Sequence, residues 1–133
     1  MTQKIVVQLV RFAASGVANT GLGLAAIYMA MLFGIQYIIA NALGYAIGLA
    51  CSFLINRTWT FQRKTGGAHK DIIPFLLLAL AAYAVNLAAV VSLVELTGTP
   101  VVMAQLVGVV VYAICSFLGM KYLVFPSDRS PDQ

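Results

Sequence analysis

The chain has 133 residues, 62% of them hydrophobic and 9% charged, with a formal net charge of +4. Soluble domains contain about 45–50% apolar and about 25% charged residues, so this composition excludes an ordinary soluble fold and indicates a membrane protein. Since a transmembrane helix needs about 20 mostly apolar residues, the chain has room for only a few spans.

Four long apolar stretches follow one another along the chain. We expect them to form transmembrane helices at about residues 9–33, 38–56, 72–96 and 101–124. The first follows a short polar end carrying Lys4, and it exceeds the core of a signal peptide, about 7–15 residues, so we expect it to be retained. Short turns at 34–37 and 97–100 separate the helices of each pair. The sequence thus predicts an all-α polytopic membrane protein that forms one domain, residues 1–133.

The stretch between the two helix pairs is polar. Residues 57–61, RTWTF, are typical of an amphipathic segment on the membrane surface, with Trp59 and Phe61 as anchors at headgroup depth. Residues 62–71, QRKTGGAHKD, are expected to form a flexible loop, because they contain a Gly-Gly pair. Pro74 would then fall in the first turn of the third helix, where its missing N–H does little harm.

Residues 41–61 recur in altered form at 105–125, aligned without a gap. The matches are Gly44 with Gly108, Cys51-Ser52-Phe53-Leu54 with Cys115-Ser116-Phe117-Leu118, Arg57 with Lys121, Phe61 with Phe125, and Asn41 with Gln105. This pattern predicts an internal duplication, in which two tandem repeats each contribute two helices. The two cysteines lie in apolar runs, so we expect small buried thiols without a disulfide.

Lysine and arginine residues gather on one side of this four-helix scheme. They are Lys4, Arg11, Arg57, Arg63, Lys64, Lys70, Lys121 and Arg129, whereas the opposite turns carry only Glu95. The positive-inside rule therefore predicts that both termini and loop 62–71 are cytoplasmic, in a multi-pass protein of the cytoplasmic (inner) membrane. Because each copy has two spans, both copies cross the membrane in the same direction, and they are expected to be related by an axis along the membrane normal.

Small and polar residues form stripes on the predicted helices. At about 100° per residue, single faces carry Gly16, Asn19 and Gly23; Asn41, Gly44, Gly48, Ser52 and Asn56; Tyr83 and Asn86; and Gln105, Gly108, Tyr112 and Ser116. For the glycines we favour close helix packing. Two interpretations stay open for the amides at 19, 41, 86 and 105, namely hydrogen bonds between helices or the lining of a polar pathway.

Three cations are predicted at one headgroup level. Arg11 begins the first span, while Arg57 and Lys121 occupy the matched ends of the second and fourth. They could anchor the helices, since both kinds of side chain extend to the interface, or they could bind a phosphate or diphosphate, for which the planar fork of Arg57 is well suited. Both interpretations stay open.

The sequence lacks a group of residues typical of an enzyme. The acids are Asp71, Glu95, Asp128 and Asp132, of which none lies in the middle of a span and none pairs with a histidine or cysteine at ligand spacing. A phosphate-binding glycine loop is also absent. We therefore expect a protein that is not an enzyme, needs no cofactor and no metal, and binds no nucleic acid.

Three motifs resemble those of the GtrA-like family of small four-span membrane proteins. They are Arg11-Phe12 with Gly16-Val17-Ala18-Asn19-Thr20, Ala40-Asn41-Ala42-Leu43-Gly44-Tyr45, and Ser52-Phe53-Leu54-Ile55-Asn56-Arg57-Thr58-Trp59-Thr60-Phe61. The resemblance implies a role in cell-surface polysaccharide or glycolipid synthesis, in which members are proposed to move polyprenyl-phosphate-linked sugars to the outer leaflet. The second copy departs from the motif at 120–123, so the two halves of a symmetric site would be chemically unequal.

Together, the residues and the resemblance predict a flippase for a polyprenyl-phosphate-linked sugar. The residues expected to bind its phosphate are Arg57, Lys121 and Arg11, and those expected along the sugar path are Asn19, Asn41, Asn56, Asn86, Gln105, Ser52 and Tyr83. Helices packed about 8–10 Å apart leave no channel wide enough for a sugar, so we expect either a homodimer that meets along the small-residue stripes or a sugar head that slides along an outer groove. The alternatives are a non-transporting scaffold that recruits a membrane glycosyltransferase, and a small multidrug exporter, which would be expected to hold an embedded acid.

Overall fold

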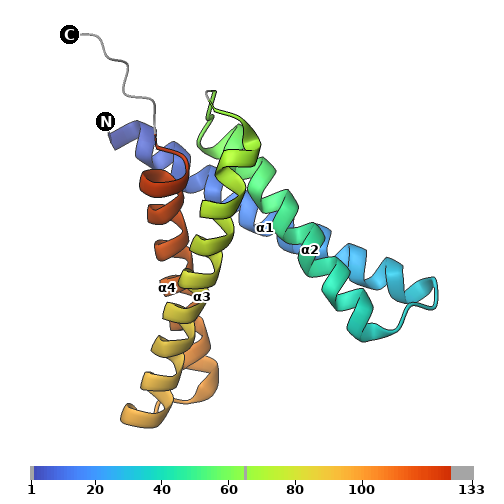
Figure 1. The fold of residues 1–133 in the computed structure, drawn as a ribbon. Coiled ribbons are helices and arrows are strands. Elements are labelled where there is room, and N and C mark those ends of the chain that lie inside the picture. The colour runs from blue at the N-terminus through green and yellow to red at the C-terminus, as the bar shows by residue number, and fades with distance from the viewer. Residues whose placement is uncertain (1, 65, 127–133) are drawn as a thin grey trace. The chain divides into compact units, whose positions relative to one another are not determined.

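The computed structural model describes residues 2–64 and 66–126, and every regular element in these ranges is helical. The long helices are α1 (Thr2–Leu32), α2 (Tyr37–Ile55), α3 (Ala68–Thr97) and α4 (Val101–Gly119), shown in Figure 1. Two short π-helices, η1 (Asn56–Thr60) and η2 (Met120–Val124), continue α2 and α4. By length and composition, four helical segments could cross a membrane, at 3–32, 37–60, 68–97 and 101–124. The prediction of an all-α four-span protein is confirmed.

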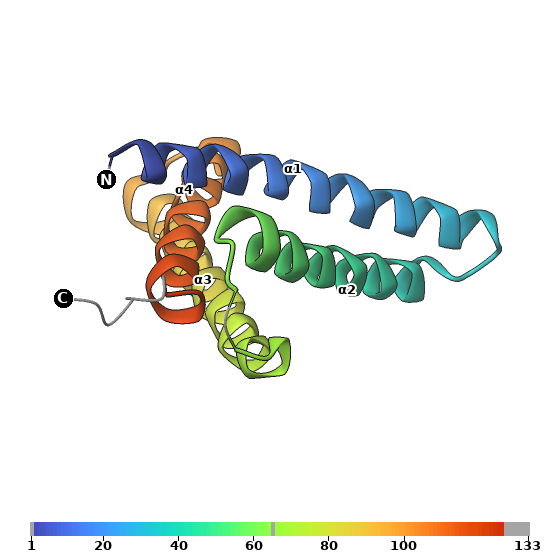
Figure 2. The ribbon, with the colours of Figure 1, turned by 90° about the horizontal axis from the view of Figure 1, so that it is seen from above.

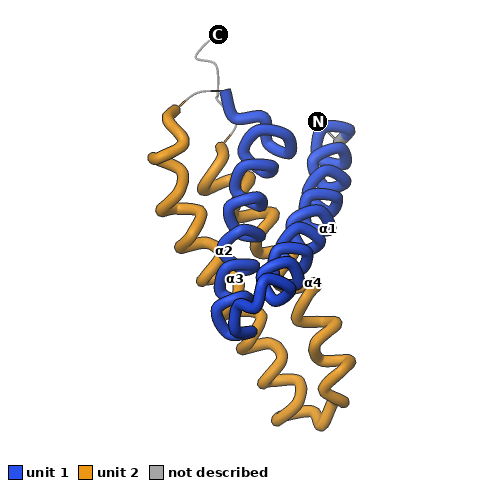
Figure 3. The backbone as a smooth tube through the Cα atoms, turned by 90° about the vertical axis from the view of Figure 1, so that its right-hand side faces the viewer, with its two compact units in different colours: residues 1–64 blue, residues 65–133 orange. Residues whose placement is uncertain are grey.

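The chain divides into two compact units, residues 1–64 and 65–133 (Figure 3). In the N-terminal unit α1 runs antiparallel to α2 and η1, which Figure 2 shows from above. In the C-terminal unit α3 packs in the same way against α4 and η2. Each unit is therefore a helical hairpin whose two polar ends lie together. That both hairpins act as one membrane domain stays a prediction.

The two hairpins repeat one another at a distance of 64 residues. Both second helices have 19 residues, and both end in a five-residue π-helix. The buried positions match as well, namely Ala40 with Ala104, Gly44 with Gly108, Ser52 with Ser116, Phe53 with Phe117 and Phe61 with Phe125. The structure confirms the tandem repeats and extends them to the preceding turns, where Gly34 and Gly98 both have positive φ, 80° and 66°.

The π-helices arise from packing and not from one polar side chain. In each, the N–H of a phenylalanine donates to the carbonyl five residues earlier, from Phe61 to Asn56 at 2.9 Å and from Phe125 to Met120 at 2.7 Å. The first residue is an amide in one copy and a thioether in the other, so its chemistry does not set the wide turn. Both phenylalanines are buried. We infer that burial of these rings draws the chain inward and widens the last turn.

Glycines allow α1 and α2 to approach closely. A Cβ on Gly44 would meet the backbone oxygen of Gly23 at 2.7 Å and the side chain of Ile27, and a Cβ on Gly48 would meet the backbone oxygen of Asn19 at 3.3 Å. Nothing lies within 4 Å of a Cβ on Gly16, which therefore lies outside this contact. The packing interpretation is confirmed for the other glycines of these two stripes, and it was wrong for Gly16.

Two predicted boundaries near the polar end of the N-terminal unit need correction. The helix α1 begins at Thr2 and not near residue 9, so the polar N-terminal residues, including Lys4, belong to the same helix as the apolar stretch that follows them. Residues 56–60 continue α2 and do not lie on the surface as a separate segment. Trp59 is 44% exposed, as an interface anchor should be, but Phe61 is buried because the wide turn carries its ring into the hairpin.

The polar loop is shorter than predicted. The extended conformation of Gly67 ends it, and α3 begins at Ala68, so residues 68–71 are helical. Asp71 is buried in the first turn of α3, where a carboxylate suits the positive end of the helix dipole. Pro74 consequently lies inside the helix, beyond the first turn, where its N–H would have donated to the Lys70 carbonyl. Residues 128, 129 and 132, named above for their charges, lie outside the described ranges.

Candidate functional site

A cluster of polar side chains closes one end of the N-terminal hairpin. We call it the polar cap and define it as Arg11, Ser15, Ser52, Asn56 and Trp59. Because α1 and α2 are antiparallel, the first half of α1 lies beside the last turns of α2 and η1 (Figure 2). Side chains of the cap join the two segments. The contacts within it connect residues 41 and 48 positions apart in the chain.

The inner part of the cap is a buried hydrogen-bonded clamp. The hydroxyl of Ser15 lies 2.9 Å from the Phe12 carbonyl and 3.0 Å from Asn56 Oδ1. Asn56 Nδ2 donates to the Ser52 carbonyl at 2.8 Å and approaches Ser52 Oγ at 3.3 Å. Since a carbonyl oxygen can only accept, the amide orientation is fixed with Oδ1 toward Ser15. The serine and asparagine side chains are buried, so this clamp holds α1 to α2 and is not open to solvent.

The outer part of the cap holds a cation. Arg11 Nη1 donates to the Trp59 carbonyl at 3.0 Å, and the Arg11 guanidinium carbon lies 5.5 Å from the centre of the Trp59 ring. Carbonyls of the last turn lack donors within their own helix, so Arg11 acts as a cap supplied by the neighbouring helix. A guanidinium has five N–H groups, and this hydrogen bond uses one of them.

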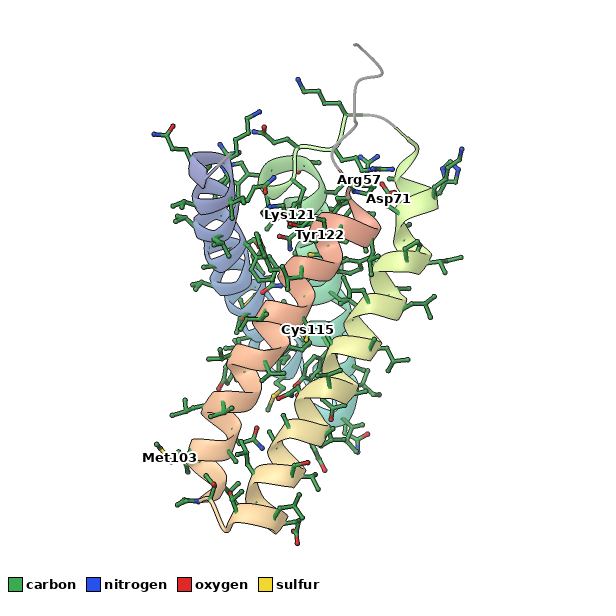
Figure 4. All side chains as sticks on the ribbon, turned by 90° about the vertical axis from the view of Figure 1, so that its left-hand side faces the viewer. Arg57, Asp71, Met103, Cys115, Lys121 and Tyr122 are labelled. Atoms are coloured by element: carbon green, nitrogen blue, oxygen red, sulfur yellow. The ribbon has the colours of Figure 1, made fainter. Side chains whose placement is uncertain are left out.

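The other two predicted cations lie at equivalent helix ends. Arg57, in η1, and Lys121, in η2, are both half-buried, and both stand where a positive charge suits the helix dipole. The ammonium of Lys121 lies 5.8 Å from the Phe117 ring centre and 5.4 Å from that of Tyr122. Figure 4 shows Lys121 and Tyr122 near one end of the C-terminal hairpin and Met103 near the other. Convergence of all three cations on one ligand stays a prediction.

The residues predicted along a sugar path have different surroundings within each hairpin, and their role stays a prediction. In the N-terminal unit Ser52 and Asn56 belong to the clamp, Asn41 Nδ2 donates to the Tyr37 carbonyl of its own helix at 2.9 Å, and Asn19 packs its backbone against Gly48. Asn41 thus lies about two turns from that contact.

In the C-terminal unit Asn86 fills the notch at Gly108, where its Oδ1 is buried and has no hydrogen-bond partner among the described residues. Gln105 is exposed one turn away, and Tyr83 is 55% exposed. Asn86 and Gln105 therefore share one level of their hairpin.

Sequence reasoning missed Ser15 and Thr60. Ser15 continues a face in which Arg11, Ser15, Asn19 and Gly23 recur every four residues, and that spacing would have identified it in place of Gly16. Thr60 is buried, and its Oγ1 has no hydrogen-bond partner among the described residues. Nothing in the sequence around Thr60 indicated its burial, which follows from the π-turn.

Comparison with known protein families identifies the family of this chain. The family model described as GtrA/DPMS, transmembrane domain, matches residues 11–125. The chain belongs to the GtrA/DPMS transmembrane family. The match begins at the cap arginine and ends at the last buried phenylalanine, so it covers both hairpins. A curated relative, the Uncharacterized membrane protein YngA of Bacillus subtilis (strain 168), is 26% identical over 115 residues, which is 86% of this chain and 77% of that protein. This GtrA/DPMS protein is accordingly a multi-pass membrane protein.

The second hairpin of this GtrA/DPMS protein lacks a polar cap. At the positions 64 residues beyond Arg11, Asn56 and Trp59 it has Phe75, Met120 and Leu123. Phe75 and Met120 are buried, so apolar packing closes this end of the hairpin. The counterpart of Ser52, Ser116, is buried with no hydrogen-bond partner for its Oγ among the described residues. The duplication therefore keeps the fold in both halves and the polar cap in only one.

Proposed function

We propose that this protein moves a polyprenyl-phosphate-linked sugar between the leaflets of the cytoplasmic membrane, for cell-surface polysaccharide or glycolipid synthesis. One observation carries the proposal: a GtrA/DPMS transmembrane domain ends in a polar cap that fixes a guanidinium beside a partly exposed tryptophan. Tryptophan is enriched at headgroup depth, which is the level at which a lipid-linked phosphate would first meet the protein.

The chemistry of such a substrate explains why so small a protein would suffice. The prenyl tail stays in the hydrocarbon, so only the charged and hydroxylated head needs a shielded route. Within the proposal, the candidate phosphate-binding groups are Arg11, Arg57 and Lys121, and side-chain amides serve the sugar hydroxyls. The acids are outside the middle of the described spans, so movement would run downhill, as glycosyl transfer on the far side consumes the carrier.

Packing within the N-terminal hairpin restricts where that route would lie. The Gly44 and Gly48 face is filled by α1, and Asn56 and Ser52 are committed to the clamp. The head therefore would not pass between α1 and α2, and it would follow an outer face of the hairpin. A homodimer remains part of the proposal, with its contact on a face other than the one that Gly44 and Gly48 form.

The orientation is also part of the proposal. Each hairpin has its ends on one side, where Lys4, Arg11 and Arg57 of the first and Lys70 and Lys121 of the second lie. The positive-inside rule places these ends in the cytoplasm, together with the connection between the hairpins.

A non-transporting scaffold is the second candidate, and the closed clamp favours it. Buried polar residues that hold two helices together would serve a platform for a membrane glycosyltransferase as well as they serve a transporter. A multidrug exporter is a weaker candidate, since the described parts of the spans hold no acid in their middle to bind a cationic drug.

Leaflet exchange in vesicles made from defined lipids and the purified chain separates the two candidates. A fluorescent polyprenyl-phosphate sugar is placed in both leaflets, and a membrane-impermeant reductant bleaches the outer one. A flippase should make nearly all of the label accessible, whereas a scaffold should leave about half protected. The matched control is a vesicle with an unrelated four-helix membrane protein at the same density. Protection equal to that control would exclude transport by this chain alone.

A further inference from the structure

The polar cap holds a guanidinium, that of Arg11, whose position is defined by two contacts. The Arg11 Nη1 hydrogen bond to the Trp59 carbonyl fixes its position, and the indole ring at 5.5 Å constrains its plane. Ordering an arginine side chain lowers its conformational entropy, and here contacts inside the protein order the side chain before a ligand binds. Arg11 is therefore preorganised.

The Arg11 guanidinium keeps donors for a ligand. One of its five N–H groups is used by Trp59, and the side chain is only half-buried. A planar fork of this kind binds a phosphate through two parallel charge-assisted hydrogen bonds. Because the site stands at the boundary of apolar helices, the local dielectric is lower than that of water and the attraction to an anion is stronger.

The described residues of the second hairpin offer no comparable group. The counterpart of Arg11 is the buried Phe75, and the counterpart of Arg57 is Lys121, a compact ammonium 5.8 Å and 5.4 Å from the ring centres of Phe117 and Tyr122. Lysine attracts a phosphate as a point charge and lacks the two-pronged geometry. The apolar residues at 75, 120 and 123 show that this fold closes a hairpin end without the serine–asparagine clamp of the first hairpin.

We propose that Arg11, oriented by Trp59, is the primary phosphate-binding group of the protein, and that only the N-terminal hairpin carries this site. Its ligand is a phosphate or diphosphate ester on a lipid tail, so that the phosphate lies against the cap while the tail remains among the apolar helices. The inference rests on the proposed function for the identity of that lipid. It assigns the two halves of the duplication different tasks, ligand binding in the first and structural support in the second.

The tryptophan itself is the reporter of binding. Trp59 is the single tryptophan of the chain, and Arg11 lies over its ring. A phosphate that binds the guanidinium changes the charge facing the indole, so the emission of Trp59 should change with saturation. We would titrate the full chain in nanodiscs of zwitterionic lipid with farnesyl phosphate, with farnesol, with inorganic phosphate and with phosphatidylglycerol. The proposal expects a saturable change with farnesyl phosphate and none with farnesol at the same concentration.

Four variants decide which cation carries the site. Arg11→Lys keeps the charge and loses the fork, so affinity for farnesyl phosphate should fall about tenfold or more. Arg11→Met removes the charge and keeps an apolar stem, and binding should be lost. The matched control is Lys4→Met, which removes an exposed cation of the same helix that lies outside the polar cap and should leave affinity within about twofold of the unmodified chain. Lys121→Met, in the second hairpin, should lower affinity less than Arg11→Met does. Circular dichroism identifies any variant that fails to fold, and Arg11→Lys keeps the test decisive if Arg11→Met does.

Several outcomes would overturn the proposal. Equal changes with farnesol would show that the tail and not the phosphate is detected, and equal affinity for inorganic phosphate or phosphatidylglycerol would show a general anion site. A loss with Lys121→Met as large as with Arg11→Met would show a shared site in both hairpins. Binding that depends on Arg11 but no leaflet exchange would leave this inference standing and refute the flippase. Leaflet exchange that survives in Arg11→Met would refute this inference and leave the proposed flippase standing.

Discussion

Replacing Gly44 by alanine tests the contact that forms the N-terminal hairpin. The new methyl group would meet the backbone oxygen of Gly23 at 2.7 Å, and it would also meet the side chain of Ile27. The isoleucine side chain can rotate away, but a backbone oxygen moves only if the whole helix moves. The substitution should therefore push α1 and α2 apart.

The size of the effect follows from this distance. Carbon contacts are most favourable at about 3.5–4.0 Å, so the helices must separate by roughly 0.8 Å, a gap that forfeits about a quarter to a half of the dispersion energy at the contact. Overpacking of this kind destabilises by about 1–3 kcal/mol. Alanine also favours a helix over glycine by about 1 kcal/mol, which opposes the loss. The test therefore needs a control substitution that brings the same gain in helix propensity without the clash.

Gly21→Ala is the matched control. Gly21 lies on α1, and nothing is within 4 Å of a Cβ built there, so the substitution brings the helix propensity of alanine and no clash. The free energy of unfolding of Gly44→Ala should fall below that of Gly21→Ala by about 1–3 kcal/mol, which is a factor of about 5–150 in the unfolding equilibrium.

Trp59 again provides the measurement, because Arg11 of the opposite helix covers its ring only while the hairpin is closed. Mixed micelles with increasing dodecyl sulfate would unfold each variant, and the tryptophan emission would report separation of α1 from α2. If the two variants unfold at the same detergent fraction, the close approach at Gly44 and Gly23 is not a feature of the folded hairpin, and the packing argument fails.

Three further predictions concern the cap and the orientation. Arg57→Gln should abolish glycan modification in cells at matched protein abundance and Arg57→Lys should reduce it, whereas full activity with glutamine would remove Arg57 from the phosphate site. Thr60→Val should leave the hairpin as stable as before, or stabilise it by up to about 1–3 kcal/mol, in the same micelle titration. The reason is that Thr60 Oγ1 is buried without a hydrogen-bond partner among the described residues, and the second copy has valine at this position. Marked destabilisation would show that Thr60 makes a hydrogen bond in the folded hairpin. Single cysteines replacing the exposed residues Lys64 and Leu96, in a chain without native cysteines, should react with an impermeant thiol reagent from opposite sides of the membrane, and labelling of both from outside intact cells would contradict the predicted topology.

The sequence by itself determined the number of helices, their approximate ends and the duplication. A helix in lipid must satisfy its backbone hydrogen bonds internally, so apolar length alone specifies each span. The repeated motif was visible because Gly44, Ser52 and Phe53 have counterparts at a fixed distance. The motifs also indicated the family, and the importance of the region around Arg57 and Trp59 was evident from its unusual composition.

Only the tertiary structure decided how the helices face one another. A stripe at helical spacing covers a broad arc, so the sequence could not distinguish Gly16 from Ser15 as the residue of α1 that meets α2. The hydrogen bond from Arg11 to the Trp59 carbonyl joins positions 48 apart and depends on the axial register of two helices, which no local pattern encodes. The π-turns depend likewise on where a buried phenylalanine finds room. These contacts made Arg11 a cap of the neighbouring helix, a role that the buried Phe75 cannot take in the second hairpin.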